Sequence, residues 1–423
     1  MESNIFELTT EQLKDIAIAL QNGVAEGLVT DYEERDRKLA KGEKVEAKDG
    51  EIRCIPTYIN PKFISEGKAL VLDLGGTNFR ATVVEFKNGE AIVHPGMKEN
   101  LVSLMKNPQC TLEQLYAKMA SLISSLKLDG VTDIGYCFSY PGESLLNGDA
   151  NLIKWNKGVD IKDLIGKPVG KTLLDYLNAN VKGARFKNIK VINDTVAALF
   201  SGLTDTKSQA HIGLIVGTGT NMAPFIPVER IPKLDKAYTG KGLIPINLES
   251  GNFNPPHLTV IDDKIDKYLD TKGRQRFEKA ISGMYLGRIL EYLFSSDEFE
   301  DNFDAEKLTS IMSYPSRFKE KYVKAAHWVY ERSAKLVAAS LSGLILQIIA
   351  TGEKPVTDIR LSAEGSLFWS NDRKVRNASY LPYKDLVINE LDKILKEFGH
   401  EIKIHVEQKE NANLIGSAIA ALS

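Results

Sequence analysis

The chain has 423 residues, 43% of them hydrophobic and 26% charged, as is typical of a folded globular protein with two or three domains. Lysine and arginine number 54 against 56 acidic residues, so the net charge of −2 provides no basic field for nucleic acid or an anionic membrane. Three widely spaced cysteines argue against a disulfide framework and a zinc site, and they favour a reducing cytoplasm.

Residues 1–64 begin with an amphipathic helix, for which Thr9 and Gln12 have the spacing of a capping box. The start of the chain has no basic region and no unbroken apolar centre, so it does not resemble a signal peptide. A charged stretch, residues 31–51, is expected to be a solvated helix end and loop. From residue 68 to about 216, strands alternate with helices, which predicts a mixed or parallel α/β sheet.

A glycine turn follows the first apolar strand, in the segment ALVLDLGGTNFRATVVEF. Asp73 ends that strand, and a carboxylate in an apolar strand needs a partner or a metal. The turn residues are Gly75, Gly76, Thr77 and Asn78. Glycines let backbone N–H groups approach an anion, so the turn is suited to phosphate, although an ordinary hairpin explains the stretch equally well.

The segment 137–166 is long, polar and rich in glycine and asparagine, and loops of this length in compact domains tend to be functional. Ser139, Asn156 and Lys157 offer donors and acceptors that suit a polyhydroxylated ligand. A packed surface loop is the alternative interpretation.

The segment VINDTVAALFSG joins an apolar strand to an apolar helix through Asn193, Asp194 and Thr195. These residue types are good helix N-caps, with Thr195 the candidate cap, and Gly202 suits the helix end. Capping alone would explain them, so a functional role depends on the rest of the chain.

A second glycine turn, Gly217, Thr218 and Gly219, follows another apolar strand about 140 residues after the first. Two such turns indicate a loose internal duplication, with one phosphate-binding hairpin in each domain. Further along, Asn247 and Glu249 lie in IPINLESGNF. Glu278 lies near the start of a helix, where pairing with the helix dipole would also explain it.

The apolar stretch 336–352 is expected to be a buried core helix rather than a membrane span. A second cluster of strands follows, and the chain ends in an apolar helix, NLIGSAIAALS.

Taken in order, LDLGGTNFR, FSYPGE, WNKGVDI, INDTVAAL, GTGTN and INLESGNF resemble the hexokinases of the eukaryotic type, glucokinase included. CIPTYI, FEKAISGMYLG and LSAEGSLF extend the resemblance over nearly the whole chain. It implies an α/β protein with the two-lobed, actin-like ATPase (ribonuclease H-like) fold and a cleft between a small and a large domain. The implied small domain is 65–195, joined by the C-terminal helix 408–423, and the implied large domain is 1–64 with 196–407.

The resemblance also implies transfer of the γ-phosphoryl group of Mg-ATP to the 6-hydroxyl of an aldohexose, with glucose as the favoured sugar. The residues implied to hold the sugar are Ser139, Asn156, Lys157, Asn193, Asp194, Asn221, Asn247, Glu249 and Glu278. The residues implied to handle the phosphates and Mg²⁺ are Asp73, Gly75, Gly76, Thr77, Asn78, Arg80, Gly217, Thr218, Gly219, Gly365 and Ser366. Asp73 would act on the Mg²⁺ through a water molecule.

Because a sugar hydroxyl is a poor nucleophile, a carboxylate must accept its proton, and Asp194 is the candidate base. Lys157, Arg80 and Mg²⁺ would stabilise the transferred phosphoryl group. We expect sugar binding to close the lobes and expel water, with hinges near residues 64 and 195. Glu364 stands where the family more often has Asp. A hexose and Mg-ATP are the expected partners, without nucleic acid or membrane, and the protein could be a monomer or a homodimer.

Two alternatives remain open at this point. Another phosphotransferase of the same fold would keep both glycine turns but has no need of Asn247 and Glu249. A non-catalytic sugar-sensing protein, or an actin-like structural ATPase, would be expected to lose the base, and Asp194 is present.

Overall fold

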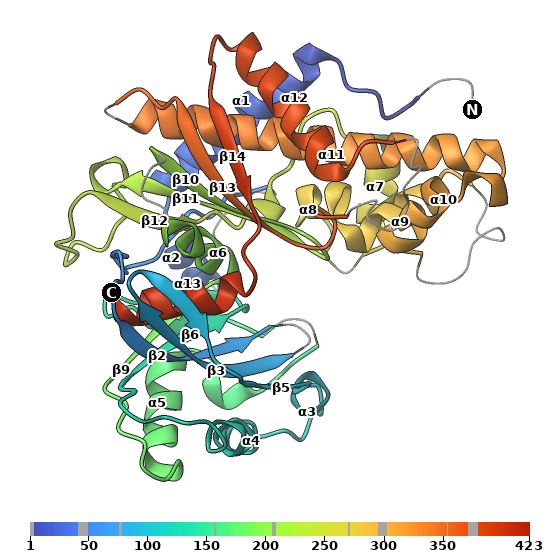
Figure 1. The fold of residues 1–423 in the computed structure, drawn as a ribbon. Helices are drawn as coiled ribbons and strands as arrows, with labels where there is room; N and C mark the ends of the chain where they lie inside the picture. The colour runs from blue at the N-terminus through green and yellow to red at the C-terminus, as the bar shows by residue number, and fades with distance from the viewer. Residues whose placement is uncertain are drawn as a thin grey trace.

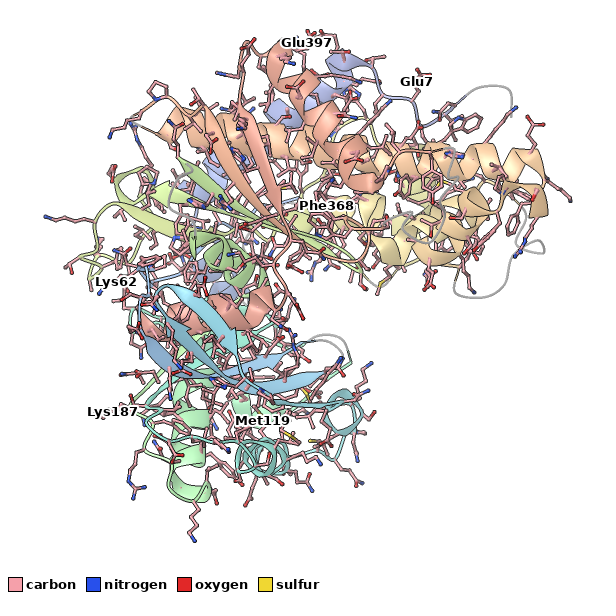
Figure 2. The ribbon with its side chains drawn as sticks, in the orientation of Figure 1. Glu7, Lys62, Met119, Lys187, Phe368 and Glu397 are labelled. Atoms are coloured by element: carbon pink, nitrogen blue, oxygen red, sulfur yellow. The ribbon has the colours of Figure 1, made fainter. Side chains whose placement is uncertain are left out.

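The computed structural model describes residues 4–40, 50–75, 78–155, 158–204, 209–269, 271–294, 303–352, 354–370 and 380–423. Figure 1 shows two lobes, each built on its own β-sheet. In Figure 2, Phe368 and Glu397 lie in the upper lobe and Met119 and Lys187 in the lower one. We call the upper lobe the large lobe and the lower one the small lobe.

The strands of the large-lobe sheet are, in order, β1 (Ile55–Pro56), β12 (Leu243–Asn247), β11 (Thr220–Pro227), β10 (Ala210–Val216), β13 (Asp358–Glu364) and β14 (Lys403–Glu407). β10 pairs antiparallel with β11 and parallel with β13, which pairs parallel with β14. On one side of β10 the sheet therefore continues through an antiparallel hairpin, and on the other side it continues through two parallel strands.

The strands of the small-lobe sheet are, in order, β4 (Glu90–Val93), β3 (Phe79–Lys87), β2 (Gly67–Leu74), β6 (Asp133–Phe138) and β9 (Asn188–Ile192), with β5 (Met97–Glu99) also paired to β3. β2 pairs antiparallel with β3 and parallel with β6, which pairs parallel with β9. The order is the same as in the large lobe, so the internal duplication predicted from the two glycine turns is present in the sheet topology. A separate hairpin joins β7 (Gly142–Ser144) to β8 (Ala150–Leu152).

The large lobe is organised around one long helix, α11 (Glu320–Thr351), with α1 (Thr10–Val29) and α12 (Tyr383–Glu397) packed against it (Figure 1). The predicted capping box of α1 is confirmed, since Thr9 Oγ1 accepts the Gln12 N–H and Gln12 Oε1 accepts the Thr9 N–H. By length and composition α11 is the one helix of the described segments that could cross a membrane. However, 83% of its most apolar window is buried, which confirms a core helix.

Other helices outside the small lobe are α2 (Tyr32–Ala40), α7 (Val260–Lys267), α8 (Arg276–Ile281), α9 (Gly283–Glu291) and α10 (Ala305–Ser313). The prediction of only a helix end and loop in the charged stretch was wrong, because α2 is a separate helix there. Residues 41–49 of that stretch lie outside the described residues.

In the small lobe, α3 (Val102–Met105), α4 (Leu112–Ile123) and α5 (Val169–Asn180) lie on the side of the sheet away from the large lobe (Figure 1). Successive residues of a strand face opposite sides of a sheet. Leu70, Leu72 and Leu74 of β2 therefore pack in the core formed with α4 and α5. Ala69 and Val71 pack in a second core on the other face, and Asp73, two residues further, points to that same face.

Two helices lie between the sheets: α6 (Asp194–Ser201) and α13 (Ala412–Leu422) (Figure 1). α13 follows β14 of the large lobe yet packs on β2, β6 and β9 of the small lobe and on α6. Gly416 permits this approach, because a Cβ there would stand 2.0 Å from the Ala197 carbonyl oxygen. The N-terminus of α6 is thereby placed at the boundary between the lobes.

Candidate active site

Asp194 is the first residue of α6, directly after β9. Asn193 is the N-cap, its Oδ1 accepting the Thr195 N–H at 2.9 Å, so the prediction that Thr195 is the cap was wrong. Asp194 Oδ1 also accepts the Thr195 N–H, at 2.8 Å, and Asp194 Oδ2 accepts the Ser139 hydroxyl at 3.3 Å. A helix N-terminus favours negative charge. Both oxygens of Asp194 are thus held where a carboxylate is stabilised.

Asn221, Asn247 and Glu249 of the large lobe form a connected network. Asn221 Nδ2 donates to Asn247 Oδ1 at 2.7 Å, and Asn247 Nδ2 donates to Glu249 Oε1 at 2.8 Å. Asn221 Oδ1 accepts the backbone N–H groups of Met222 and Ser250, at 2.8 and 3.1 Å. Glu249 has φ of 52°, a left-handed backbone that non-glycine residues adopt rarely and often at functional sites. The network fixes the directions of these side chains before any ligand binds.

Glu278 projects from α8 toward the second glycine turn. Its Oε2 accepts the Thr220 N–H at 3.0 Å, and a Cβ added at Gly219 would stand 2.5 Å from the same oxygen. The alternative that Glu278 serves only its own helix dipole does not account for this contact with another element.

One cavity joins three of the predicted sugar residues from both lobes. Its described lining includes Asn193 directly after β9, Asn247 at the end of β12 and Glu249 beyond it, together with Thr57 and Ser144. Asn156 and Lys157 lie outside the described residues. Their neighbour Trp155 is buried, its Nε1 donating to the Ile161 carbonyl at 2.7 Å and its ring packing on Tyr140.

The first glycine turn carries a buried charge. Asp73, 5% exposed, pairs with Arg80 of the facing strand, whose Nε donates to Asp73 Oδ2 at 3.0 Å. Gly75 N–H donates to the Asn78 carbonyl at 3.1 Å and closes the turn. Gly76 and Thr77 lie outside the described residues.

Cys137 lies beside Asp73 in the adjacent strand, where the two residues are Cα partners. Burial, with the carboxylates of Asp73 and Asp194 near, raises the pKa of this thiol well above its usual range. The sequence pattern alone does not mark Cys137 as a site residue, because its place next to two site carboxylates depends on strand register.

The second glycine turn is packed rather than charged. Gly217 N–H donates to the Gly219 carbonyl at 2.9 Å, and the Gly217 carbonyl accepts the Gly283 N–H at 2.7 Å. A Cβ at Gly217 would lie 3.2 Å from the Gly365 Cα and 3.4 Å from the Ser366 nitrogen. Thr218 is exposed at the tip. The structure therefore brings the predicted residues 217–219 and 365–366 together, and the Phe368 N–H donates to the Val216 carbonyl at 2.9 Å.

Glu364 lies at the end of β13, directly before Gly365. Burial raises the pKa of Glu364 to about 7, against opposing effects of the Lys409 N–H and the Arg80 guanidinium. Since Arg80 belongs to the small lobe and Glu364 to the large lobe, this effect of the guanidinium charge acts across the lobe boundary.

Among the described residues, no group of three or more His, Cys, Asp or Glu side chains could hold a metal ion by itself. Mg²⁺ usually takes one or two carboxylates together with substrate phosphates and keeps several water ligands. Asp73, the carboxylate before the first glycine turn, is a ligand of the type that such a site needs.

Thr220 and Ser250 are site residues that sequence reasoning missed. Both act through backbone N–H groups, toward Glu278 and Asn221 respectively. Backbone donors leave no residue-type signal, so only the folded chain identifies them.

Two sequence profiles of the hexokinase family match the chain, over residues 3–203 and 211–322. Hexokinase-3 of Oryza sativa subsp. japonica is 32% identical over 288 residues, which cover 64% of this chain and 56% of that protein. The chain thus spans little more than half the length of this curated relative.

Solved structures share the fold. A hexokinase from Schistosoma mansoni complexed with glucose matches with a TM-score of 0.73 and 22% identity, over 99% of this chain and 97% of that chain. A ROK family glucokinase from Streptomyces griseus, in complex with glucose and AMPPNP, matches with a TM-score of 0.52 and 18% identity, over 84% and 99%. The predicted two-lobed, actin-like α/β fold is confirmed.

Proposed function

Because the chain belongs to the hexokinase family, we propose that it transfers the γ-phosphoryl group of ATP to the 6-hydroxyl of an aldohexose, with glucose as the favoured sugar. The observation that carries this proposal is the cavity where Asn193, next to Asp194, meets Asn247 and Glu249 of the other lobe. The two solved structures named above are complexes with glucose, and one of them also contains AMPPNP.

Asp194 is the base in this proposal. It accepts the proton of the attacking hydroxyl, and its Ser139 and Thr195 hydrogen bonds hold the carboxylate in one orientation. The positive end of α6 stabilises the charge that Asp194 carries before it accepts the proton.

The large-lobe network selects the sugar. Asn221, Asn247 and Glu249 are already connected, so a ligand with correctly placed hydroxyls can replace or extend their hydrogen bonds. A ligand without those hydroxyls leaves buried polar groups unpaired, which penalises it strongly. Glu278 and, by resemblance, Asn156 and Lys157 complete the proposed sugar contacts.

The two glycine turns and Arg80 hold the phosphates in this proposal, with Asp73 directed at Mg²⁺ through water. When bound, Mg²⁺ supplies positive charge that neutralises the phosphate oxygens. Residues 65–195 would move relative to the large lobe about hinges near 64 and 195, so that sugar binding excludes water from Asp194.

A coupled assay with Mg-ATP and a panel of hexoses tests the proposal. We expect hexose-dependent ADP formation, and in Asp194→Ala a fall in kcat of about 100- to 10,000-fold, the usual contribution of a general base. Asp175→Ala, an exposed carboxylate on α5, is the control and should keep normal turnover.

Each contrary result has a distinct meaning. ADP formation with a non-sugar acceptor only would favour another phosphotransferase of the fold. Hexose binding without turnover in the wild type would favour a sugar sensor. Near-normal turnover in Asp194→Ala would remove Asp194 from the mechanism.

A further inference from the structure

Glu278 lies between two residues that are almost completely buried. Phe277 is 0% exposed, its N–H donates to the Phe253 carbonyl at 2.8 Å, and its ring packs on Phe253. Lys279 is 3% exposed. Successive residues of a helix point about 100° apart. Because the side chains of Phe277 and Lys279 are both fixed, the rotation of α8 is fixed, and with it the direction in which Glu278 projects. That direction leads to Thr220 and Gly219.

Lys279 is a buried cation with two hydrogen bonds from its ammonium group. Its Nζ donates to Asp266 Oδ1 at 2.6 Å and to the Thr271 carbonyl at 2.7 Å. Asp266 Oδ2 also accepts the Gly273 N–H at 2.9 Å, and Arg276 Nη1 lies 3.4 Å from it. Although burial opposes it, these hydrogen bonds and charges hold the pKa of Asp266 below its usual value. The pair therefore connects α8 to α7 and to the loop that precedes α8.

α8 has little of its own to fix its rotation. It has six residues, no side-chain N-cap hydrogen bond, and a left-handed N-cap residue, Gln275, with φ of 54°. Helices this short are held by tertiary contacts rather than by propensity. Arg332, bonded to Asp262 in a buried pair, supports the end of α8 through the Ala280 carbonyl at 3.1 Å.

Stability alone does not account for a buried lysine at this position. Replacing a buried ion pair by well-packed apolar side chains is often neutral or stabilising. What an apolar pair would lose is direction, because Lys279 must point at two oxygen acceptors of fixed position, Asp266 Oδ1 and the Thr271 carbonyl, whereas hydrophobic contacts are non-directional.

We propose that the buried Lys279–Asp266 ion pair is a positioning element that directs the Glu278 carboxylate and so sets the affinity for the hexose. This inference rests on the proposed function, since it names how one part of that sugar site is held. Lys279 acts through Glu278 and does not itself touch the sugar.

The test compares Lys279→Met with the double variant Asp266→Asn, Lys279→Met. The single variant leaves Asp266 buried without its cation, so its Tm falls. The double variant removes both charges, and its Tm should recover much of that loss. In both, we expect the hexose KM and the calorimetric Kd for glucose to rise about 10- to 100-fold, the value of one misplaced hydrogen bond to a charged group, while the ATP KM stays within about twofold.

Arg360→Met is the matched control, because Arg360 forms a partly buried ion pair with Glu407 at 2.6 Å in the same lobe. It should lower Tm without changing the hexose KM. If Lys279→Met does not fold, the double variant alone decides the question.

Recovery of the hexose KM together with Tm in the double variant, or an equal change in both substrate constants, would overturn the inference and leave the proposed function standing. A wild-type protein that neither binds nor phosphorylates any hexose would overturn both.

Discussion

The turn after β2 and the turn after β10 occupy matching places in their sheets, yet their glycines meet different surroundings. A Cβ at Gly75 would find the Asn78 carbonyl at 3.9 Å as its nearest neighbour, an ordinary contact. A Cβ at Gly219 would stand 2.5 Å from the Glu278 carboxylate, and one at Gly365 would stand 2.2 Å from the Val216 carbonyl.

The loosely packed first turn has the buried ion pair, and the tightly packed second turn has none in the described part of the chain. The first turn has the buried Asp73 and its partner Arg80. The second turn has no such pair among its described residues and is surrounded by backbone groups of Gly283 and Gly365. A glycine required by packing has a structural explanation, whereas Gly75 has none in the described fold, so the ligand-binding interpretation is better supported for the first turn.

Among variants that compare the two turns, we expect the largest effect from removing the charge of the first turn. Asp73→Asn keeps the shape of the side chain and removes its charge, so we expect kcat to fall about 100- to 1,000-fold, as when one group that stabilises the transition state is lost. Glucose binding should be unchanged. Turnover measured over a Mg²⁺ series checks this, with Glu85→Gln, a similarly buried carboxylate of the same sheet, as control. Near-normal kcat at all Mg²⁺ concentrations would show that the first turn has no charge-dependent role.

Gly219→Ala tests the packing of the second turn. The added Cβ meets the tip of a flexible side chain, so Glu278 moves away from the Thr220 N–H and the fold is little strained. We expect the hexose KM to rise about tenfold with a Tm close to that of the wild type. A large fall in Tm without a change in hexose KM would contradict this explanation.

Gly75→Ala is the matched substitution in the first turn. Free space around the added Cβ predicts a change in unfolding free energy within about 0.5 kcal/mol. If the Gly75 backbone approaches a phosphate, the ATP KM rises about three- to tenfold while the hexose KM does not change. Steady-state kinetics with each substrate varied in turn would distinguish the effect of Gly75→Ala on the ATP KM from the effect of Gly219→Ala on the hexose KM. If both variants changed the same KM, the proposed difference between the two turns would be wrong.

The smallest effect concerns pH. Because burial raises the pKa of Glu364 from 4.5 to about 7, the folded protein binds this proton more tightly than the unfolded chain. The contribution of Glu364 to stability is therefore complete below pH 4.5 and is lost as pH rises through about 7.

Glu364→Gln cannot ionise, so its Tm relative to the wild type should increase between about pH 5 and about pH 8 and level off above that range. Thermal melts of the two proteins at several pH values in this range would measure the difference in Tm. A constant difference in Tm would mean that Glu364 titrates near its ordinary pKa.

Local features of the fold could be predicted from the sequence. The capping box of α1 joins residues three apart, and the glycine turns connect adjacent strands, so neighbouring residues contain the necessary information. The cap of α6 shows the limit of such reasoning. Asn193, Asp194 and Thr195 are all good caps, and only the backbone conformation decides that Asn193 has the role.

The order of the segments that resemble hexokinases predicted the fold class and the residues proposed to meet the sugar, and the apolar pattern placed Asp194 after a strand. Tertiary structure decided which of them touch: Asn221 with Asn247, Glu278 with Thr220, and Cys137 beside Asp73. These contacts join segments between about 25 and 65 residues apart, and such separations depend on strand register and helix rotation rather than on local preference. The buried Lys279 and Asp266 belong to the same class, because a charged residue becomes an interior one only when the folded chain supplies its partner.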